Sequence, residues 1–352
     1  MTDRIDIKSA TMEELKELLA GWGEKTFRAG QIFSWLHEKR VSSFAEMTNL
    51  SKALREKMEE ECTLTQMKEI DRLESVDGTK KFLFELFDGQ AIESVLMKYH
   101  HGNSVCISSQ AGCRMGCKFC ASTLGGLIRN LTAGEMLQQI YEIEQITGEN
   151  VSNVVVMGTG EPMDNYDNFI RFVRILSAKE GKNISVRNIT VSTCGIVENM
   201  KRLAEENLPL TLAFSLHAPN DEIRKQLMPV AYKYKLEEVL AACDYYYEKT
   251  GRRITYEYSL VEGVNDSAAC AAELANKLKG KNCHVNLIPV NSIKERDFKK
   301  SGNAAIQNFK NTLEKKSIAC TIRREMGSDI NAACGQLRRS HTLKENTERE
   351  EE

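Results

Sequence analysis

The sequence predicts an α/β protein whose main part is a full or partial TIM-like barrel of about six strand–helix units. Six short apolar segments alternate with helical segments beyond residue 100, and repeated units of this kind form parallel sheets. Polar residues follow several of these segments, at the strand ends where barrel enzymes place their sites. The expected strands occupy residues 105–108, 154–157, 189–192, 212–215, 254–258 and 285–288.

Residues 1–75 are predicted to form a helical accessory domain. Segments 9–19 and 25–36 have apolar residues at helical spacing, with residues typical of helix starts before them. Basic and aromatic side chains lie close together around the second segment: Lys25, Arg28, Lys39 and Arg40 near Phe27, Phe33 and Trp35. These residues indicate either an ordinary helical bundle with solvated charges or an RNA-binding surface.

Residues 76–98 are predicted to form a β-hairpin linker, because they alternate in strand fashion around an Asp88-Gly89 turn. The barrel is then expected over residues 99–340. Within it, Thr132 and Glu135 form a capping-box pattern that begins a helix, and another helix is expected from about Tyr166. The charged, apolar-poor tail at residues 341–352 is predicted to be disordered.

Composition indicates a protein of a reducing compartment, expected to be cytoplasmic. The chain has 352 residues, a formal net charge of −2 and 41% hydrophobic residues, enough for a large core. It contains no apolar run long enough to span a membrane and begins without a secretory signal. Its eleven cysteines are therefore expected to be cluster ligands, catalytic groups or buried thiols rather than disulfides.

The most informative motif is Cys113-x3-Cys117-x2-Cys120, with Phe119 beside the third cysteine. Three thiolates can bind three irons of a cubane cluster and leave the fourth iron open to a substrate or cofactor, whereas electron-transfer clusters are generally held by four cysteines. A zinc site is an alternative, but zinc motifs usually add a second ligand pair, and the downstream candidates Cys194 and His217 are single residues. Buried, inert thiols are a further alternative.

The motif resembles that of the radical S-adenosylmethionine (SAM) superfamily. In that superfamily the open iron binds SAM, and one electron from the cluster releases a 5′-deoxyadenosyl radical. The protein holds and aims the cofactor. Gly160 and Glu161, after the second expected strand, resemble the superfamily's Gly-Glu motif, which binds the methionine amino group.

Two more segments narrow the resemblance to the RlmN family, dual-specificity RNA adenine-C2 methyltransferases. One carries Cys106 and leads into the cluster motif. The other, at residues 323–337, carries Cys334 and is the most specific match. The resemblance extends from Trp35 to Leu337. It implies a partial (β/α)6 TIM-like barrel, a [4Fe-4S] cluster held by Cys113, Cys117 and Cys120, and two SAM molecules per turnover.

The resemblance also implies how the cysteines act. Adenine C2 is electron-poor and cannot attack a methyl group directly. Cys334 takes a methyl group from one SAM, since a thiolate is a good nucleophile, and the radical from a second SAM abstracts hydrogen from that methyl group. The resulting carbon radical adds to C2. A base then removes the C2 proton, and Cys106 resolves the adduct through a transient disulfide with Cys334. Glu93 matches the family's proton acceptor.

The SAM contacts implied by the resemblance lie mainly at strand ends. They are Gly160, Glu161, Ser192, Ser215, Leu216, His217 and Asn291. The implied partners are 23S rRNA, tRNA and an electron donor such as flavodoxin or ferredoxin, with no membrane and a monomeric protein. Arg114, Lys118 and Arg129 are candidate phosphate contacts.

Two other functions stay open at this point. A Cfr-type enzyme shares both cysteines but methylates adenine C8, although Pro162 and the Arg323-Arg324 pair favour the RlmN type. A non-enzymatic iron–sulfur protein that binds RNA or acts as a sensor would not need Cys334.

Overall fold

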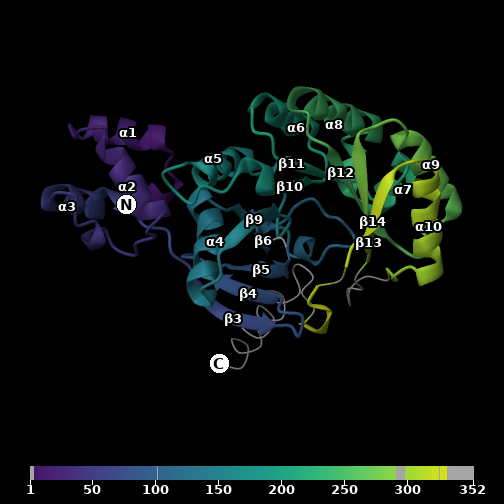
Figure 1. Ribbon diagram of the computed structural model, residues 1–352, viewed down its shortest axis with the longest axis horizontal. Coiled ribbons are helices and arrows are strands. Elements are labelled where there is room, and N and C mark those ends of the chain that lie inside the picture. The colour runs from purple at the N-terminus through teal and green to yellow at the C-terminus, as the bar shows by residue number, and fades with distance from the viewer. Residues whose placement is uncertain (1–3, 101, 291–297, 325, 331–352) are drawn as a thin grey trace.

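One curved ten-stranded sheet runs through the molecule in the computed structural model, which describes residues 4–100, 102–290, 298–324 and 326–330. The strand order is β14-β13-β12-β11-β10-β9-β6-β5-β4-β3 (Figure 1). In this sheet β6 and β9 to β14 are parallel, whereas β5, β4 and β3 extend it as antiparallel strands. Their bounds are β3 Lys68–Glu74, β4 Lys80–Glu85, β5 Ala91–Tyr99, β6 Gly102–Cys106, β9 Val151–Val156, β10 Ile189–Thr193, β11 Thr211–Ser215, β12 Ile254–Leu260, β13 Cys283–Pro289 and β14 Ala319–Ile322.

Helices follow the parallel strands and line the outer side of the sheet, from α4 to α10 (Figure 1). They are α4 Ala133–Thr147, α5 Tyr166–Ser177, α6 Val197–Glu205, α7 Asp221–Leu227, α8 Leu236–Thr250, α9 Ala268–Leu278 and α10 Asn303–Lys315. The six expected strands and the predicted fold class, a partial (β/α)6 barrel, are confirmed. The helix predicted at Thr132 is also confirmed, with both capping-box hydrogen bonds present.

The predicted boundaries of the first two segments differ from the structure. The N-terminal helices are α1 Met12–Gly21, α2 Arg28–His37 and α3 Lys52–Glu61, with β1 Ile5–Asp6 and β2 Cys62–Thr63 paired beside them. The prediction of a helical segment through residue 75 is wrong at its end, because β3 pairs with β4 in the main sheet. This strand is rich in charge, as edge strands often are, and so lacks the apolar alternation that would identify it. The expected hairpin is therefore part of a three-stranded antiparallel extension.

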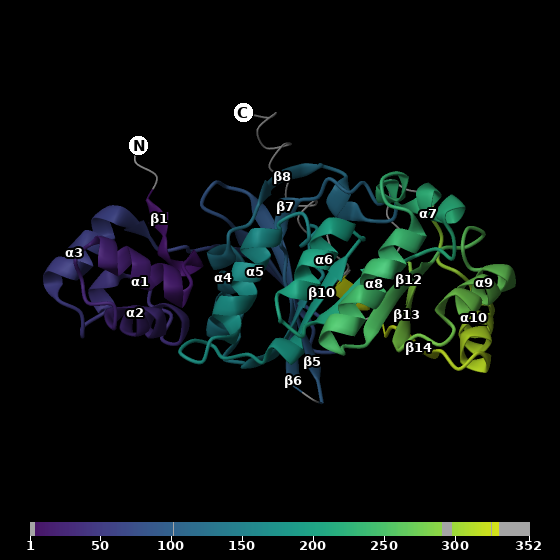
Figure 2. The ribbon, with the colours of Figure 1, turned by 90° about the horizontal axis from the view of Figure 1, so that it is seen from above.

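Buried polar contacts fix the N-terminal helices against α4. Lys8, which is 2% exposed, donates from Nζ to Gln138 Oε1 at 2.8 Å. The backbone N–H of Gly134 donates to Ser9 Oγ at 2.7 Å, and a Cβ at Gly134 would meet that oxygen at 3.1 Å. The small residue thus allows the N-terminal segment to approach the start of α4. Figure 2 shows α1–α3 as a lobe beside α4 and α5.

A second group of contacts joins the end of α2 to the middle of α4. His37 Nδ1 lies 3.2 Å from the Tyr141 hydroxyl, and Arg40 pairs with Glu144 at 2.5 Å while its guanidinium lies over the Tyr141 ring. Arg40 therefore stabilises the contact between the two parts, which removes it from the candidate RNA-binding surface. In the described part of the chain, no helix is long and apolar enough to cross a membrane.

The buried His37 makes stability depend on pH. Burial lowers the pKa of His37 to about 3, so below its ordinary pKa near 6.5 the unfolded chain binds a proton that the folded chain does not. Stability is full above about pH 6.5 and falls as the pH drops toward 3. For one such histidine the free energy of unfolding decreases by about 2 kcal/mol between pH 7 and pH 5. In His37→Leu we expect this pH-dependent loss, measured by urea unfolding, to be smaller by that amount. An equal pH-dependent loss in His37→Leu and wild type would contradict the assignment.

Candidate functional site

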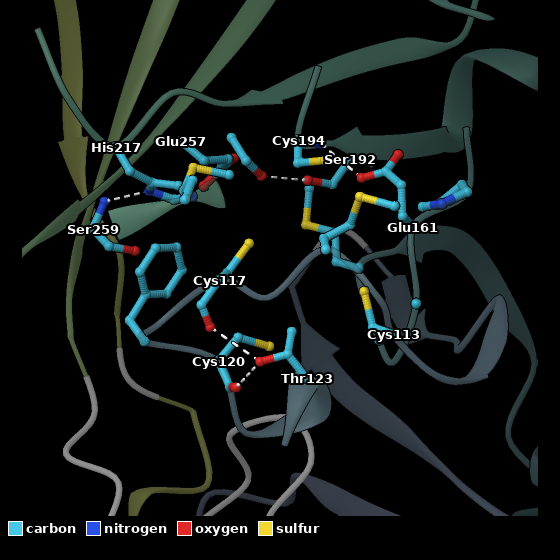
Figure 3. Close-up of a pocket in the computed structure, with 18 of the residues that line it drawn as sticks. Cys113, Cys117, Cys120, Thr123, Glu161, Ser192, Cys194, His217, Glu257 and Ser259 are labelled. Carbon is cyan, nitrogen blue, oxygen red and sulfur yellow. Dashed lines mark hydrogen bonds between the residues drawn. The ribbon is translucent and has the colours of Figure 1, made fainter. Parts of the chain in front are cut away.

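The three cysteines of the predicted cluster motif lie in a loop between the short paired strands β7 Gln110–Gly112 and β8 Leu127–Asn130. The backbone N–H of Cys113 donates to Gly126 O at 2.8 Å, which closes the loop at its base. Thr123 Oγ1 donates to the carbonyl oxygens of Cys117 and Cys120 at 3.1 and 3.0 Å. The two Thr123 contacts are drawn in Figure 3, where the three cysteines line one pocket.

The chemistry of the three thiols fits a cluster of several irons. Burial raises the pKa of each thiol, to about 12 for Cys113. The proximity of Cys113 and Cys120 raises the pKa of Cys117 further. Iron binds the deprotonated thiolate, so a bound cluster would favour the charged form that burial disfavours. In the described ranges no three His, Cys, Asp or Glu side chains converge as ligands of a single metal ion. Three thiols that line one pocket fit a cluster in which each binds a different iron.

Glu161 provides a buried carboxylate to the same pocket, on the side where Cys113 and Cys194 lie (Figure 3). Its two oxygens accept backbone N–H bonds from Met163 at 3.0 Å and Cys194 at 2.7 Å. Burial raises the pKa of the carboxyl, opposed by these donors and by Thr193. None of these main influences is a cation, so a bound ammonium group would stabilise the ionised form. This is the environment expected for a group that holds the amino group of SAM.

Polar residues at the ends of β10 and β11 complete the wall. Ser192 Oγ lies 3.2 Å from Ser215 Oγ, and both residues line the pocket with His217. His217 Nδ1 accepts a hydrogen bond from the Ser259 N–H at 2.9 Å. Burial, with Arg224 nearby, lowers the pKa of His217 to about 3. The ring is therefore neutral with its proton on Nε2, as a hydrogen-bond donor.

Comparison with known proteins decides the family. Residues 5–64 match the family described as ribosomal RNA large subunit methyltransferase N-terminal domain, and residues 107–275 match the radical SAM superfamily. A relative from Lachnoclostridium phytofermentans, named probable dual-specificity RNA methyltransferase RlmN, is 67% identical over 98% of this chain and 97% of its own. A protein of the same name from Lachnospira eligens is 61% identical over 96% of each chain.

The chain belongs to the RlmN family. The crystal structure of a radical SAM methyltransferase from Sphaerobacter thermophilus has the same fold, with a TM-score of 0.88 and 44% identity over 94% of this chain and 98% of that one. Membership of the radical SAM superfamily implies a [4Fe-4S] cluster and SAM as cofactors, and the pocket chemistry described above fits both.

Of the site residues expected from the RlmN resemblance, some line the pocket, some do not, and two lie outside the described residues. Gly160, Glu161, Ser192, Ser215, His217 and the three motif cysteines line the pocket. Leu216 is fully buried in the core, and its side chain does not line the pocket. Cys106 and Glu93 lie beside the pocket, since Glu93 acts electrostatically on both Cys106 and Cys120. Asn291 and Cys334 lie outside the described residues.

Several pocket residues were not predicted from the sequence. Glu257 and Ser259 on β12 line the pocket, as does Arg323. Cys194, considered above only as a possible zinc ligand, lines it too. Glu257 accepts a hydrogen bond from Asn286 Nδ2 at 2.9 Å, and burial raises the pKa of its carboxyl. A carboxylate inside an otherwise apolar strand was a signal available in the sequence.

The segment just before Cys334 contacts the turn between β3 and β4. Gly327 N–H donates to Asp77 Oδ2 at 3.0 Å, and the Asp329 carboxylate accepts from Ser75 Oγ at 2.5 Å and from Val76 N–H at 3.2 Å. These hydrogen bonds lower the pKa of the Asp77 carboxyl and that of the Asp329 carboxyl below the usual range for aspartate. The antiparallel extension thus anchors the chain close to the sequence position of Cys334.

The candidate phosphate contacts around the loop are partly engaged within the protein. Arg129 pairs with Asp88 and Glu135 and lies over the Phe87 ring. Arg114 pairs with Asp164, but its side chain remains 63% exposed. Arg114 therefore keeps more accessible surface for a phosphate than Arg129, whose side chain is 24% exposed.

The Gly-Glu segment generates a test of the cofactor pocket. Gly160 has φ +115°, and a Cβ there would lie 2.7 Å from the Gln110 backbone nitrogen. We expect Gly160→Ala to lower the free energy of unfolding by about 2 kcal/mol and to weaken SAM binding, because the strain lies beside Glu161. Differential scanning calorimetry and isothermal titration with SAM measure the two effects.

Gly125→Ala is the matched control, since a Cβ there meets no atom within 4 Å. Normal SAM affinity in Gly160→Ala would show that this segment does not shape the cofactor pocket.

Proposed function

We propose that this chain is a radical SAM methyltransferase that methylates C2 of an adenosine in 23S rRNA and in tRNA. The observation that carries the proposal is one pocket that combines the three thiols of the cluster motif with the buried carboxylate of Glu161. The names of the relatives, dual-specificity RNA methyltransferases, support RNA as the substrate. The words "dual-specificity" in the same names support both 23S rRNA and tRNA as substrates.

In this proposal each wall of the pocket has its own task. Cys113, Cys117 and Cys120 hold the cluster, and Gly160 and Glu161 bind the amino end of SAM. Ser192, Ser215, His217 and Asn291 contact the rest of SAM, with Leu216 limited to its backbone. When bound, the cluster and SAM supply a carbon-centred radical, and SAM also supplies the methyl group, so that two SAM molecules are used per turnover.

The remaining roles belong to side chains beside the pocket. Cys334 carries the methyl carbon to the RNA as a thioether, and Glu93 accepts the C2 proton. Cys106 then forms a disulfide with Cys334 as the bond from sulfur to the transferred carbon breaks. Burial raises the pKa of the Cys106 thiol to about 11, opposed by Arg323. A thiol that stays protonated resists premature oxidation. An electron donor such as flavodoxin or ferredoxin and a thiol reductant complete the cycle, which suits a monomeric protein in the cytoplasm.

The identity of the product tests the proposal. Anaerobic reaction of the reconstituted protein with methyl-deuterated SAM and ribosomal RNA or tRNA is expected to yield deuterated 2-methyladenosine. Liquid chromatography with mass spectrometry of the digested nucleosides separates it from 8-methyladenosine. A C8 product would assign the chain to the Cfr-type reaction, and RNA without added methyl would refute methyltransferase activity.

The division of labour among cysteines gives a second test. We expect Cys334→Ala to abolish RNA methylation and to retain visible absorption near 400 nm, because the cluster ligands are intact. Cys117→Ala should lose both. Cys270→Ala, at a buried helix position where alanine is well tolerated, is the control and should keep both. RNA methylation by Cys334→Ala would disprove the methyl-carrier role.

A further inference from the structure

A fully buried lysine forms an ion pair beside the pocket. Lys81 is 0% exposed and Glu93 is 3% exposed, and Lys81 Nζ lies 3.1 Å from Glu93 Oε2. Burying two charges costs free energy that their attraction offsets incompletely, so apolar residues of similar size are often as stable. Stability alone therefore gives little reason for this pair.

The sheet register places this pair next to Cys106. Lys81 and Leu83 on β4 lie opposite Val95 and Glu93 on β5, so Lys81 and Glu93 are diagonal neighbours on one face. Val95 in turn lies opposite Cys106 on β6, which puts Cys106 diagonal to Glu93 on the same face. The three side chains therefore lie on one face of the adjacent strands β4, β5 and β6, which Figure 1 shows side by side.

Lys81, Glu93 and Cys106 lie on the face of the sheet that is directed toward the pocket. Side chains alternate along a strand, and Ser94, the neighbour of Glu93, donates from Oγ to Gln139 Oε1 on the covering helix α4 at 2.8 Å. Glu93 therefore points away from α4. In agreement, Glu93 acts electrostatically on Cys120 of the cluster loop, and both Glu93 and Lys81 act on Cys106.

We propose that Lys81 is a positioning residue for proton removal: through the buried ion pair its ammonium holds the Glu93 carboxylate and directs it toward C2 of the bound adenine. The inference rests on the proposed function. In the step concerned, the C2–H bond of the RNA adduct breaks, the proton moves to a Glu93 oxygen, and the electron pair stays in the adenine ring. Within the part of the chain that the structure describes, the charged and titratable groups beside Glu93 include Lys81 from β4, Cys106 from β6 and Cys120 from the loop.

Lys81→Met tests this role because it removes the charge and keeps a similar length. Loss of a neighbouring cation favours the protonated form of a buried carboxylate, and a protonated carboxyl group is no base. At pH 7 we expect 2-methyladenosine formation to fall by about 100-fold, the lower range for loss of a general base. The covalent protein–RNA adduct should accumulate, seen as a nuclease-sensitive band on denaturing gels with end-labelled RNA. Raising the pH should restore product.

Two variants on the same strand serve as comparison. Lys81→Arg keeps the charge and is expected to retain activity within about 10-fold. Lys80→Met changes the adjacent residue, whose ammonium pairs with Glu74 and Glu149 at 3.3 and 3.9 Å and lies on the other face. It should match wild type in product, adduct and pH dependence.

The outcomes separate this inference from the proposed function. Wild type without 2-methyladenosine would refute both. If wild type makes the product and Lys81→Met makes it at the same rate, or loses it without adduct and without recovery at higher pH, the role of Lys81 is refuted alone. Absorption near 400 nm and circular dichroism check folding. If Lys81→Met does not fold, Lys81→Gln, which keeps a donor without charge, is judged by the same outcomes.

Discussion

Backbone hydrogen bonds align ten strands in one sheet, and their register decides which side chains share a face and which reach the pocket. A shift of one residue would turn every side chain of a strand to the opposite face. The same register brings the ends of β10 and β11 together, so that Ser192 and Ser215 lie 3.2 Å apart. At the antiparallel end it places Lys81, Glu93 and Cys106 on one face of the sheet. The pocket and the neighbouring group of Lys81, Glu93 and Cys106 thus both depend on the strand pairing of one continuous sheet.

The N-terminal helices are joined to this sheet through α4 by contacts that include buried polar groups. Lys8, Arg40 and His37 all reach α4 side chains, and such groups are costly when they lose their partners. Separation of the two parts would expose these groups and leave the partners on α4 unpaired. The lobe therefore keeps a fixed position beside the barrel (Figure 2).

The sequence predicted what local pattern encodes. The six barrel strands are apolar runs bounded by helices, and Thr132 begins α4 with a capping box, so both followed from spacing and residue type. The three cysteines and Glu161 were found because their motifs are local in sequence. Edge strands β3 and β14 were missed, since charged or exposed positions hide their alternation. Lys81 could not be connected with Glu93, because their contact depends on strand pairing. Leu216 shows the converse: a residue within a matching motif can turn its side chain into the core.

Electrostatics of the described pocket favours the bound state over the empty one. Burial raises the pKa of the motif thiols and of the Glu161 carboxyl. Without cofactors, the charged forms of these groups are therefore disfavoured. Arg224 opposes the effect of burial at Cys117. It is fully buried and donates to the carbonyl oxygens of Cys194 and Leu216 at 2.6 and 3.2 Å, and its charge lowers the pKa of Cys117. Iron and an ammonium group would relieve the remaining cost by pairing with thiolates and carboxylate, so cofactor binding stabilises the folded chain as well as equipping it for chemistry.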